Sequence, residues 1–427
     1  MLASAPASLR REPVLLQMQA EPAVLPSYRD LLAVAGLRRL AATMLSARLG
    51  GNMYQLALVL FVLERFHSPF LAGVTTFFGW VPGLLASPIA GALLDRHGRV
   101  RLIALDLWVA VATPVAIALL AFAGWLTPPL LVVVVALSAL TLPLTMTGTR
   151  SLMPLLLPRD HWDRANAVDS AIANLATVAG PALAGALAAL IGSLSTLLVV
   201  AGIWLFGAVL VVGISEPPRA TVAGHTRVMA EAWRGLTYLL RNRVLRGLAI
   251  AFPLLNASEG VLYVALPVFV LSLLHGSSAQ VGALFSSFGV AALATGLLFG
   301  RVSTQARERR IMLGGIVVSA LGITLVAVSS NLVLVFAGLL IAGAATGPLD
   351  VAMFSLRQRA TDPAWFGRSL SISMSVNALG LPIGSLFAGA LVGLSVTGSI
   401  AVSAALIVLG GAACLVLLPA RLAAPSA

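Results

Sequence analysis

The sequence predicts an all-α membrane protein with twelve transmembrane helices in two pseudo-symmetric six-helix bundles. Hydrophobic residues make up 59% of the chain and charged residues 10%, whereas a soluble domain is about half apolar and a quarter charged. So much apolar surface needs lipid as its solvent. A membrane span takes about 20 apolar residues. Twelve such runs occur, at about 40–63, 70–93, 101–123, 129–150, 165–191, 194–214, 246–274, 279–300, 311–329, 332–354, 367–394 and 398–418.

The basic residues are all arginines, and their positions indicate the orientation of the chain. There are 27 of them, and the formal net charge is +12. If the N-terminus is cytoplasmic, only Arg65 falls outside and only Arg48 lies well within a span, as the positive-inside rule expects. An even number of spans then places both termini in the cytoplasm, and we expect a multi-pass protein of the cytoplasmic (inner) membrane. The charge is explained without a nucleic-acid partner.

The longest internal polar stretch divides the chain into two halves. Within it, Trp233, Leu236 and Leu240 recur at helical spacing among arginines, which predicts a short helix on the inner membrane surface. Thr141-Leu-Pro-Leu144 and Thr346-Gly-Pro-Leu349 occupy equivalent places, so the halves look like repeats with a site between them. The expected units are a cytoplasmic tail (1–37), a bundle (38–214), a linker with the interfacial helix (215–245), a second bundle (246–418) and a cytoplasmic tail (419–427).

A short polar turn joins the second and third runs: Gly91-Ala-Leu-Leu-Asp-Arg-His-Gly-Arg-Val-Arg101. Gly91 predicts a close approach of two helices, and Gly98 predicts a sharp reversal. This pattern resembles the signature loop between helices 2 and 3 of the major facilitator superfamily of secondary transporters. A charged turn that only sets topology is the alternative. The second half repeats the stretch as Gly296-Leu-Leu-Phe-Gly-Arg301, with Gly300 where the acid is expected.

The fifth span carries Gly180-Pro181 and Gly185. Proline kinks a helix and glycine permits close packing, so a purely structural role is one reading. The element also resembles the antiporter motif of superfamily exporters. Four further stretches resemble the branch that contains macrolide-type and enterobactin-type exporters: 150–154, Ala165-Asn166, 239–247 and 366–370.

The resemblance implies a gate at the inner end of the spans. Its residues would be Gly91, Asp95, Arg96, Gly98, Arg99 and Arg150. In this fold, Asp95 would hold the outward-open state by bridging the inner loops. Its partners would be Arg150 and the start of helix 11, near Phe366–Arg368.

Two spans carry a polar face at helical spacing. Helix 1 has Arg48, Asn52 and Gln55, and helix 7 has Asn256, Glu259 and Tyr263. Both helices line the central cavity in the fold that the resemblance implies, so we expect these residues there. Ionisable residues inside a membrane mark substrate and proton pathways. Glu259 lies near mid-membrane and has two interpretations. It could carry a proton, either alone or by pairing with Arg48 and releasing that arginine when it is protonated. Alternatively, it could form a permanent structural pair with Arg48.

Two further acids have more than one interpretation. Asp350 shares a face of helix 10 with Thr346 and Arg357. It is a second candidate proton carrier, although a structural pair with Arg357 or Arg150 is slightly favoured. Asp169 lies close to the start of helix 5, where an acid favours the positive helix N-terminus.

The chain shows no features of an enzyme. It has no nucleotide-binding Gly-Lys-Ser/Thr loop, no nucleophile triad and no histidine cluster that would bind a metal, so we expect no cofactor and no metal. The sequence predicts a monomeric secondary transporter whose partners are a small-molecule substrate, protons and the lipid bilayer. It would export a small amphipathic organic compound by proton antiport with alternating access. The alternatives are an importer or facilitator of a small metabolite, and a membrane receptor on the same scaffold.

Overall fold

The structure is a computed structural model of the chain that describes residues 34, 36–158, 161–216, 228–362 and 365–419. Most of the two expected tails and the first part of the linker lie outside these ranges. The N-terminal half contains α2 (Leu37–Phe66), α3 (Pro69–His97), α4 (Arg99–Phe122), α5 (Pro128–Ala139), α6 (Leu142–Leu156), α7 (Trp162–Ile191) and α8 (Ser193–Val212).

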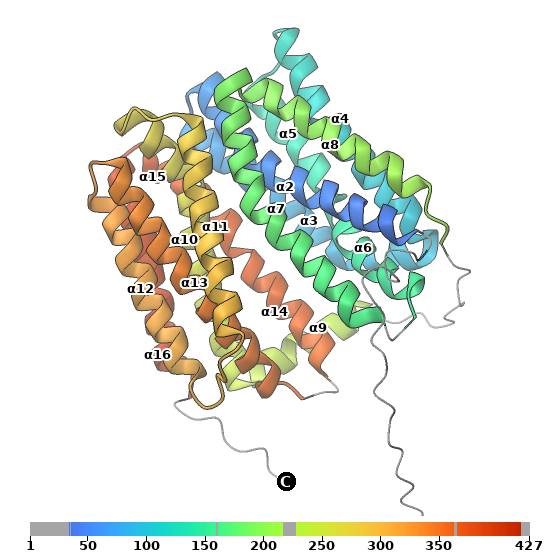
Figure 1. Cartoon of the computed structure of the whole chain (residues 1–427), viewed down its shortest axis with the longest axis vertical. Helices are drawn as coiled ribbons and strands as arrows, with labels where there is room; N and C mark the ends of the chain where they lie inside the picture. The colour runs from blue at the N-terminus through green and yellow to red at the C-terminus, as the bar shows by residue number, and fades with distance from the viewer. Residues whose placement is uncertain (1–33, 35, 159–160, 217–227, 363–364, 420–427) are drawn as a thin grey trace, which may run out of the picture.

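The C-terminal half follows a connecting helix, α9 (Val228–Arg241), that lies within the expected linker. Its helices are α10 (Arg243–Val268), the π-helical turn η2 (Phe269–Leu273), α11 (Ser278–Phe299), α12 (Glu308–Val328), α13 (Leu332–Ala360), α14 (Phe366–Ala378), α15 (Gly380–Val392) and α16 (Val396–Leu417). The blue-to-green half and the yellow-to-red half lie beside each other in Figure 1.

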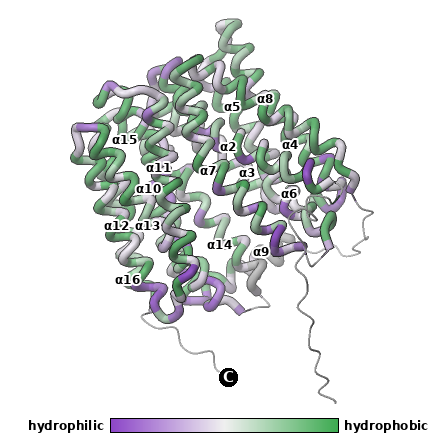
Figure 2. Tube along the Cα trace, in the orientation of Figure 1, coloured by the Kyte–Doolittle hydropathy of each residue, from purple (hydrophilic) through white to green (hydrophobic). Residues whose placement is uncertain are grey.

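The all-helical membrane fold is confirmed for the described residues. Eleven helical segments among them are long and apolar enough to cross a membrane. The expected first span is present as α2, and it falls short by composition because it contains Arg48, Asn52 and Gln55. Figure 2 shows hydrophobic residues along the lengths of the helices and hydrophilic stretches mainly near their ends, at the upper left as well as at the lower end and on the right.

Prolines divide two spans that the sequence analysis treated as single helices. The run at 129–150 breaks into α5 and α6 just before Pro143. The run at 367–394 breaks at Leu379, just before Pro382. The seventh span departs from α-helical geometry in another way, because it widens into a π-helical turn after Pro267. Proline removes a backbone donor and clashes with the preceding turn, so these departures occur where the helix loses a hydrogen bond.

The two halves pack their helices in the same pattern. In the N-terminal half, α2 contacts α7 and α8, α4 contacts α8, and α6 contacts α3 and α4. In the C-terminal half, α10 contacts α15 and α16, α12 contacts α16, and α13 contacts α11 and α12. Each of these five contacts in the N-terminal half therefore has a counterpart between the helices six spans later. This is the arrangement of two parallel repeats.

The halves meet through α3 against α15 and α7 against α11. The closest crossings lie near the starts of α3 and α11. At this end of the bundle, Arg65 is the only arginine among the described residues. We call it the arginine-poor end, and the opposite one the arginine-rich end. A Cβ added to Gly73 would lie 2.3 Å from Ser385 O, and one added to Gly282 would lie 2.4 Å from Pro181 O. Glycine is required at both crossings, so the halves are tightly closed at the arginine-poor end.

Candidate functional site

The polar face of α2 is directed at α7 and forms a buried ion pair there. Arg48 Nη2 donates to Asp169 Oδ1 at 2.5 Å, and Arg48 Nη1 donates to the carbonyl oxygen of Asp169 at 2.6 Å. Both side chains are mostly buried, with 19% and 14% exposed. Arg150 approaches the same carboxylate from α6, at 3.6 Å. One acid is therefore shared by two arginines from two other helices.

This ion pair corrects two expectations. The predicted Arg48–Glu259 pair is absent, because Arg48 is held by Asp169 inside the N-terminal half. Asp169 is also not simply an acid at a helix start. It lies at the eighth position of α7, beyond the first turn in which the helix dipole acts, and it contacts α2 and α6. Its position beyond the first turn of the helix is the sequence feature that could have identified Asp169 as an ion-pair partner.

The other two residues of the α2 face have lesser roles in this structure. Asn52 Nδ2 donates to the carbonyl oxygen of Arg48 at 2.9 Å. Asn52 also packs against Gly180, where an added Cβ would lie 2.5 Å from Asn52 Cβ. Gln55 is partly exposed. The face is therefore largely taken up by the contact between α2 and α7.

The C-terminal half contains a cavity of about 50 Å³ that brings both candidate proton carriers together. Glu259 of α10 and Asp350 of α13 line it, and the two carboxylates are close enough to interact electrostatically. The neutral polar lining consists of Asn256, Ser258, Ser319 and Thr346, and the rest is apolar. No basic residue of the described chain lines this cavity. The space is sufficient for water molecules.

No salt bridge joins Asp350 to Arg357 or Arg150 as expected, although Asp350 and Arg357 are close enough to interact electrostatically. Arg357 is fully buried, with Nη1 donating to the Met374 sulfur at 3.1 Å and the guanidinium 5.5 Å from the centre of the Phe354 ring. Arg150 binds Asp169. Asp350 is exposed. The two carboxylates of the cavity thus differ from Asp169, which has two arginine partners.

Asn256 and Tyr263 flank Glu259 along α10 and contact neighbouring helices. Asn256 Nδ2 donates to the carbonyl oxygen of Asn377 in α14 at 2.7 Å. The Tyr263 ring stacks on Phe285 of α11, with ring centres 4.9 Å apart. The polar face of α10 therefore points into the C-terminal bundle. On either side of Glu259, Asn256 contacts α14 and Tyr263 contacts α11.

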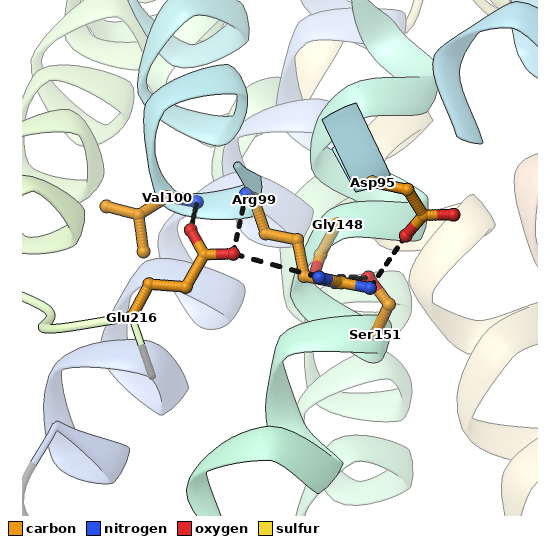
Figure 3. A network of polar contacts seen from close by, with 6 residues as sticks. All are labelled: Asp95, Arg99, Val100, Gly148, Ser151 and Glu216. Atoms are coloured by element: carbon orange, nitrogen blue, oxygen red, sulfur yellow. Dashed lines mark hydrogen bonds and ion pairs between the residues drawn. The ribbon is translucent and has the colours of Figure 1, made fainter. Parts of the chain in front are cut away.

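A polar network surrounds Arg99, the first residue of α4 (Figure 3). Arg99 Nη2 donates to Asp95 Oδ1 at 2.8 Å, and Arg99 Nε donates to Ser151 Oγ of α6 at 3.1 Å. Gly98 separates α3 from α4 with φ of 98°, a conformation that glycine adopts without strain. The predicted sharp reversal at Gly98 is therefore present.

Glu216 completes this network from the end of α8. Its carboxylate oxygens accept hydrogen bonds from the backbone N–H of Arg99 at 3.2 Å and of Val100 at 3.3 Å. The Arg99 guanidinium lies 3.7 Å from the same carboxylate. Gly98 provides no side-chain cap for α4, so Glu216 supplies one where the helix has free N–H groups and a positive dipole end. Neither Glu216 nor Ser151 was predicted from the sequence as a functional residue.

The predicted gate contacts of Asp95 are not made in this conformation. The Asp95 side chain is 74% exposed and pairs with Arg99, while Arg150 pairs with Asp169. The side chains of 366–368 lie outside the described residues. Arg96 is exposed at the end of α3. Gly91 has no neighbour within 4 Å of an added Cβ, so the expected close approach is absent here, because the tight crossing of α3 lies toward its other end. The Asp95 bridge stays a prediction for another conformation.

The Gly180-Pro181…Gly185 element joins three helices. Gly180 packs against α2, whereas a Cβ added to Gly185 would lie 2.4 Å from Ser278 O in α11. α7 continues through Pro181 without a break. The element thus connects the α2 contact inside one half with the closed crossing between the halves. Its counterpart, Gly282, was not identified from the sequence.

Comparison with known proteins identifies the family. The sequence profile of the Major Facilitator Superfamily matches residues 40–271 and 248–427. This chain belongs to that superfamily. It is 39% identical to the uncharacterized MFS-type transporter y4rN of Sinorhizobium fredii (strain NBRC 101917 / NGR234), over 86% of this chain and 91% of the relative. The predicted superfamily is therefore confirmed.

More distant superfamily relatives include drug efflux proteins. The multidrug efflux pump Tap of Mycolicibacterium fortuitum is 28% identical, over 81% of this chain and 87% of that protein. The macrolide efflux protein A of Streptococcus pyogenes is 23% identical, over 77% and 82%. The predicted resemblance to drug exporters is thus also confirmed.

Solved structures of superfamily transporters share the fold. The nucleoside transporter NupG matches with a TM-score of 0.72 and 13% identity, over 89% of this chain and 98% of that one. The inward-facing, occupied form of a bacterial homologue of the lysosomal transporter Spinster matches with a TM-score of 0.74 and 13% identity, over 93% and 99%. The predicted twelve-helix architecture agrees with these folds.

Proposed function

We propose that this superfamily transporter exports a small amphipathic organic compound in exchange for protons. The observation that carries the proposal is the cavity in the C-terminal half, which is lined by Glu259 and Asp350 among mostly apolar residues. Ionisable groups inside a membrane are costly and mark ion or proton pathways. The efflux relatives Tap and macrolide efflux protein A favour export.

The orientation follows from the arginines. The positive-inside rule supports a cytoplasmic location for the arginine-rich end, so both termini would lie there and the membrane would be the cytoplasmic one. The tight crossings at Gly73 and Gly282 then close the outer side. The described conformation is accordingly assigned as inward-facing, the state in which an exporter takes up its substrate.

In this proposal, protons and substrate use the C-terminal cavity at different stages of the cycle. Protons that enter from outside protonate Glu259 or Asp350, and they leave to the cytoplasm in the inward-facing state. Movement of α10 and α13 with their half carries the two carboxylates from one side to the other. Arg48, already bound by Asp169, holds its own half together and is not the partner of Glu259.

The test combines a compound screen with reconstituted transport. Growth of a deletion strain and an overexpressing strain across a panel of amphipathic compounds selects a transported probe. Purified protein in proteoliposomes should then concentrate this probe against its gradient when ΔpH is imposed. Glu259→Gln should abolish the uphill movement and retain probe-for-probe exchange, because the halves still alternate without a proton.

Glu64→Gln is the matched control. It makes the same change of carboxylate to amide at the arginine-poor end of α2, where Glu64 binds Ser193, and it should retain ΔpH-driven transport. If Glu259→Gln still concentrates the probe uphill, Glu259 is not the carrier and Asp350→Asn is tested next. A wild-type protein that moves no member of the panel under any gradient would contradict export of such compounds.

A further inference from the structure

The connecting helix α9 lies at the arginine-rich end, packed against α14 and joined to α10 (Figure 1). Only Asn242 separates α9 from α10. Asn242 Oδ1 accepts from the N–H of Val244 at 3.0 Å and of Leu245 at 3.2 Å, which caps the start of α10. Because α10 begins a membrane span, α9 lies at the depth where that span leaves the bilayer.

One side of α9 is fixed to the protein. Leu239 is 1% exposed. The Tyr238 ring stacks on Trp365, with ring centres 5.1 Å apart and planes inclined by 7°. Tyr238 Oη also accepts from the N–H of Asp362 at 3.0 Å, and Asn242 Nδ2 donates to Ala360 O at 2.8 Å. These contacts attach α9 to the connection between α13 and α14.

The other side of α9 exposes apolar and basic residues in adjacent rows. Trp233 is 69% exposed and Leu240 is 50% exposed, and their spacing of seven residues places them on one face. Arg234 and Arg241 have the same spacing and form the neighbouring row, and both are exposed. Arg243 extends the row into α10 and is also exposed. From 233 to 246 the sequence contains no Asp or Glu.

We propose that this face, formed by Trp233, Arg234, Leu240, Arg241 and Arg243, binds anionic phospholipid headgroups. Tryptophan and leucine suit the boundary between headgroups and acyl chains. Guanidinium groups bind phosphate through paired N–H donors. Arginines clustered on an amphipathic helix beside a membrane span are attracted to anionic lipid. Acidic residues that would compete with lipid phosphates are absent from 233–246.

Lipid bound here acts on one half of the transporter. α9 contacts α14 and α10, and its Tyr238 holds the turn at Asp362. An anionic leaflet would therefore fix the end of α13 and the start of α14 to the membrane surface, while the N-terminal half has no equivalent described helix at its start. This predicts that anionic lipid stabilises the C-terminal half specifically.

The test measures lipid binding by the full-length protein in nanodiscs. Wild-type protein should be stabilised against thermal unfolding when phosphatidylglycerol replaces part of the phosphatidylcholine. The triple variant R234Q/R241Q/R243Q should lose roughly 100-fold in phosphatidylglycerol affinity, since each arginine near an anionic surface contributes about a fivefold factor. R234K/R241K/R243K, which keeps the charge, should retain most of the preference.

The matched control is R301Q/R307Q/R310Q, which removes the same charge from exposed arginines of the 300–307 connection and the start of α12 at the same end. It should keep the preference for phosphatidylglycerol. An equal loss in this control would mean that net charge alone acts, and an unchanged R234Q/R241Q/R243Q protein would also overturn the proposal. Soluble glycerol phosphate should not stabilise the wild type; if it does so as well as lipid, the site binds free phosphate. Should the triple variant not fold, Trp233→Ser with Leu240→Ser must weaken lipid binding in its place.

Discussion

The two halves of this transporter have the same helix packing but treat their membrane-embedded charges differently. In the N-terminal half, Asp169 is held by Arg48 at 2.5 Å and approached by Arg150 at 3.6 Å. In the C-terminal half, Glu259 and Asp350 share a cavity that no basic residue of the described chain lines. Paired charges stabilise a fixed arrangement, whereas carboxylates outside a salt bridge are available for the proton exchange that we propose. The difference therefore supports the proposal that protons are carried by the C-terminal half, while the ion pair of the N-terminal half is structural.

The two halves also differ in which residues cap the N-termini of their helices. In the N-terminal half, α4 and α8 each start after a glycine without a side-chain cap. Carboxylates from elsewhere in the chain replace the cap, because Glu216 accepts from the start of α4 and Glu64 from the start of α8. A local cap residue is present in α3 of the N-terminal half, Ser68, and in four C-terminal helices, where it is Asn242, Ser277, Asn331 and Ser395. In the N-terminal half, the caps supplied by distant residues therefore link the start of one helix to the end of another.

The largest expected effect concerns the paired acid. Asp169→Asn leaves Arg48 mostly buried without its anion, and breaking a buried pair in this way costs about 3 kcal/mol or more of unfolding free energy. Asp350→Asn removes an acid that has no arginine within an ion-pair distance and should change that free energy by about 1 kcal/mol at most. Denaturation in mixed micelles measures both. If both variants lose the same unfolding free energy, the acids of the two halves do not differ in their structural role.

The sequence could predict the fold because each span is a long apolar run and each connection is short. Gly98 needed only local information, since a single residue between two helices must reverse the chain. The breaks before Pro143 and Pro382 were less predictable, because α7 and α13 continue through Pro181 and Pro348. Whether a proline ends a membrane helix depends on the neighbours that satisfy the freed carbonyl groups.

The candidate site was harder to predict, for a physical reason. Arg48 was recognised as costly in a membrane, but its partner could be any acid on a neighbouring helix, and the sequence does not state which helices touch at that depth. Asp169 is 121 residues away along the chain. Glu216 lies 117 residues from Arg99. Local caps such as Asn331 can be recognised from the sequence, whereas caps from distant residues require the fold.

The next effect tests the symmetry of the closure at the arginine-poor end. Gly73→Ala and Gly282→Ala each place a Cβ against backbone, 2.3 Å from Ser385 O and 2.4 Å from Pro181 O. Overpacking of this kind costs about 1–3 kcal/mol, and the two variants should lose similar amounts if the crossings are equivalent. Gly91→Ala is the control, because nothing lies within 4 Å of its added Cβ. A loss confined to one crossing would show that one pair of helices holds the closure.

A smaller effect tests the caps supplied by distant residues. Glu216→Ala and Glu64→Ala each remove the acceptor at a helix start, and loss of an N-terminal cap costs about 1 kcal/mol. Asn331→Ala removes a local cap from α13 and is the C-terminal counterpart, expected to cost the same. Unfolding free energies of the three variants compare them directly. If both glutamate variants are neutral, water satisfies those N–H groups and the caps do not join the helix ends.

The smallest expected effect on stability comes from Asp95→Asn, and it separates the gate from the scaffold. In this conformation Asp95 is 74% exposed and pairs only one turn away with Arg99, and such a pair contributes about 0.5 kcal/mol or less. The substitution keeps the size of the side chain and should leave expression, unfolding and probe binding unchanged. We expect transport nevertheless to fall sharply, because in the proposed cycle the charge is needed when the arginine-rich ends of the halves meet in the other conformation. Proteoliposome flux and unfolding measured on the same preparations decide the point, with Glu64→Gln as the charge-matched control. If Asp95→Asn transports at the wild-type rate, the turn at Gly98 only determines the membrane topology of the chain.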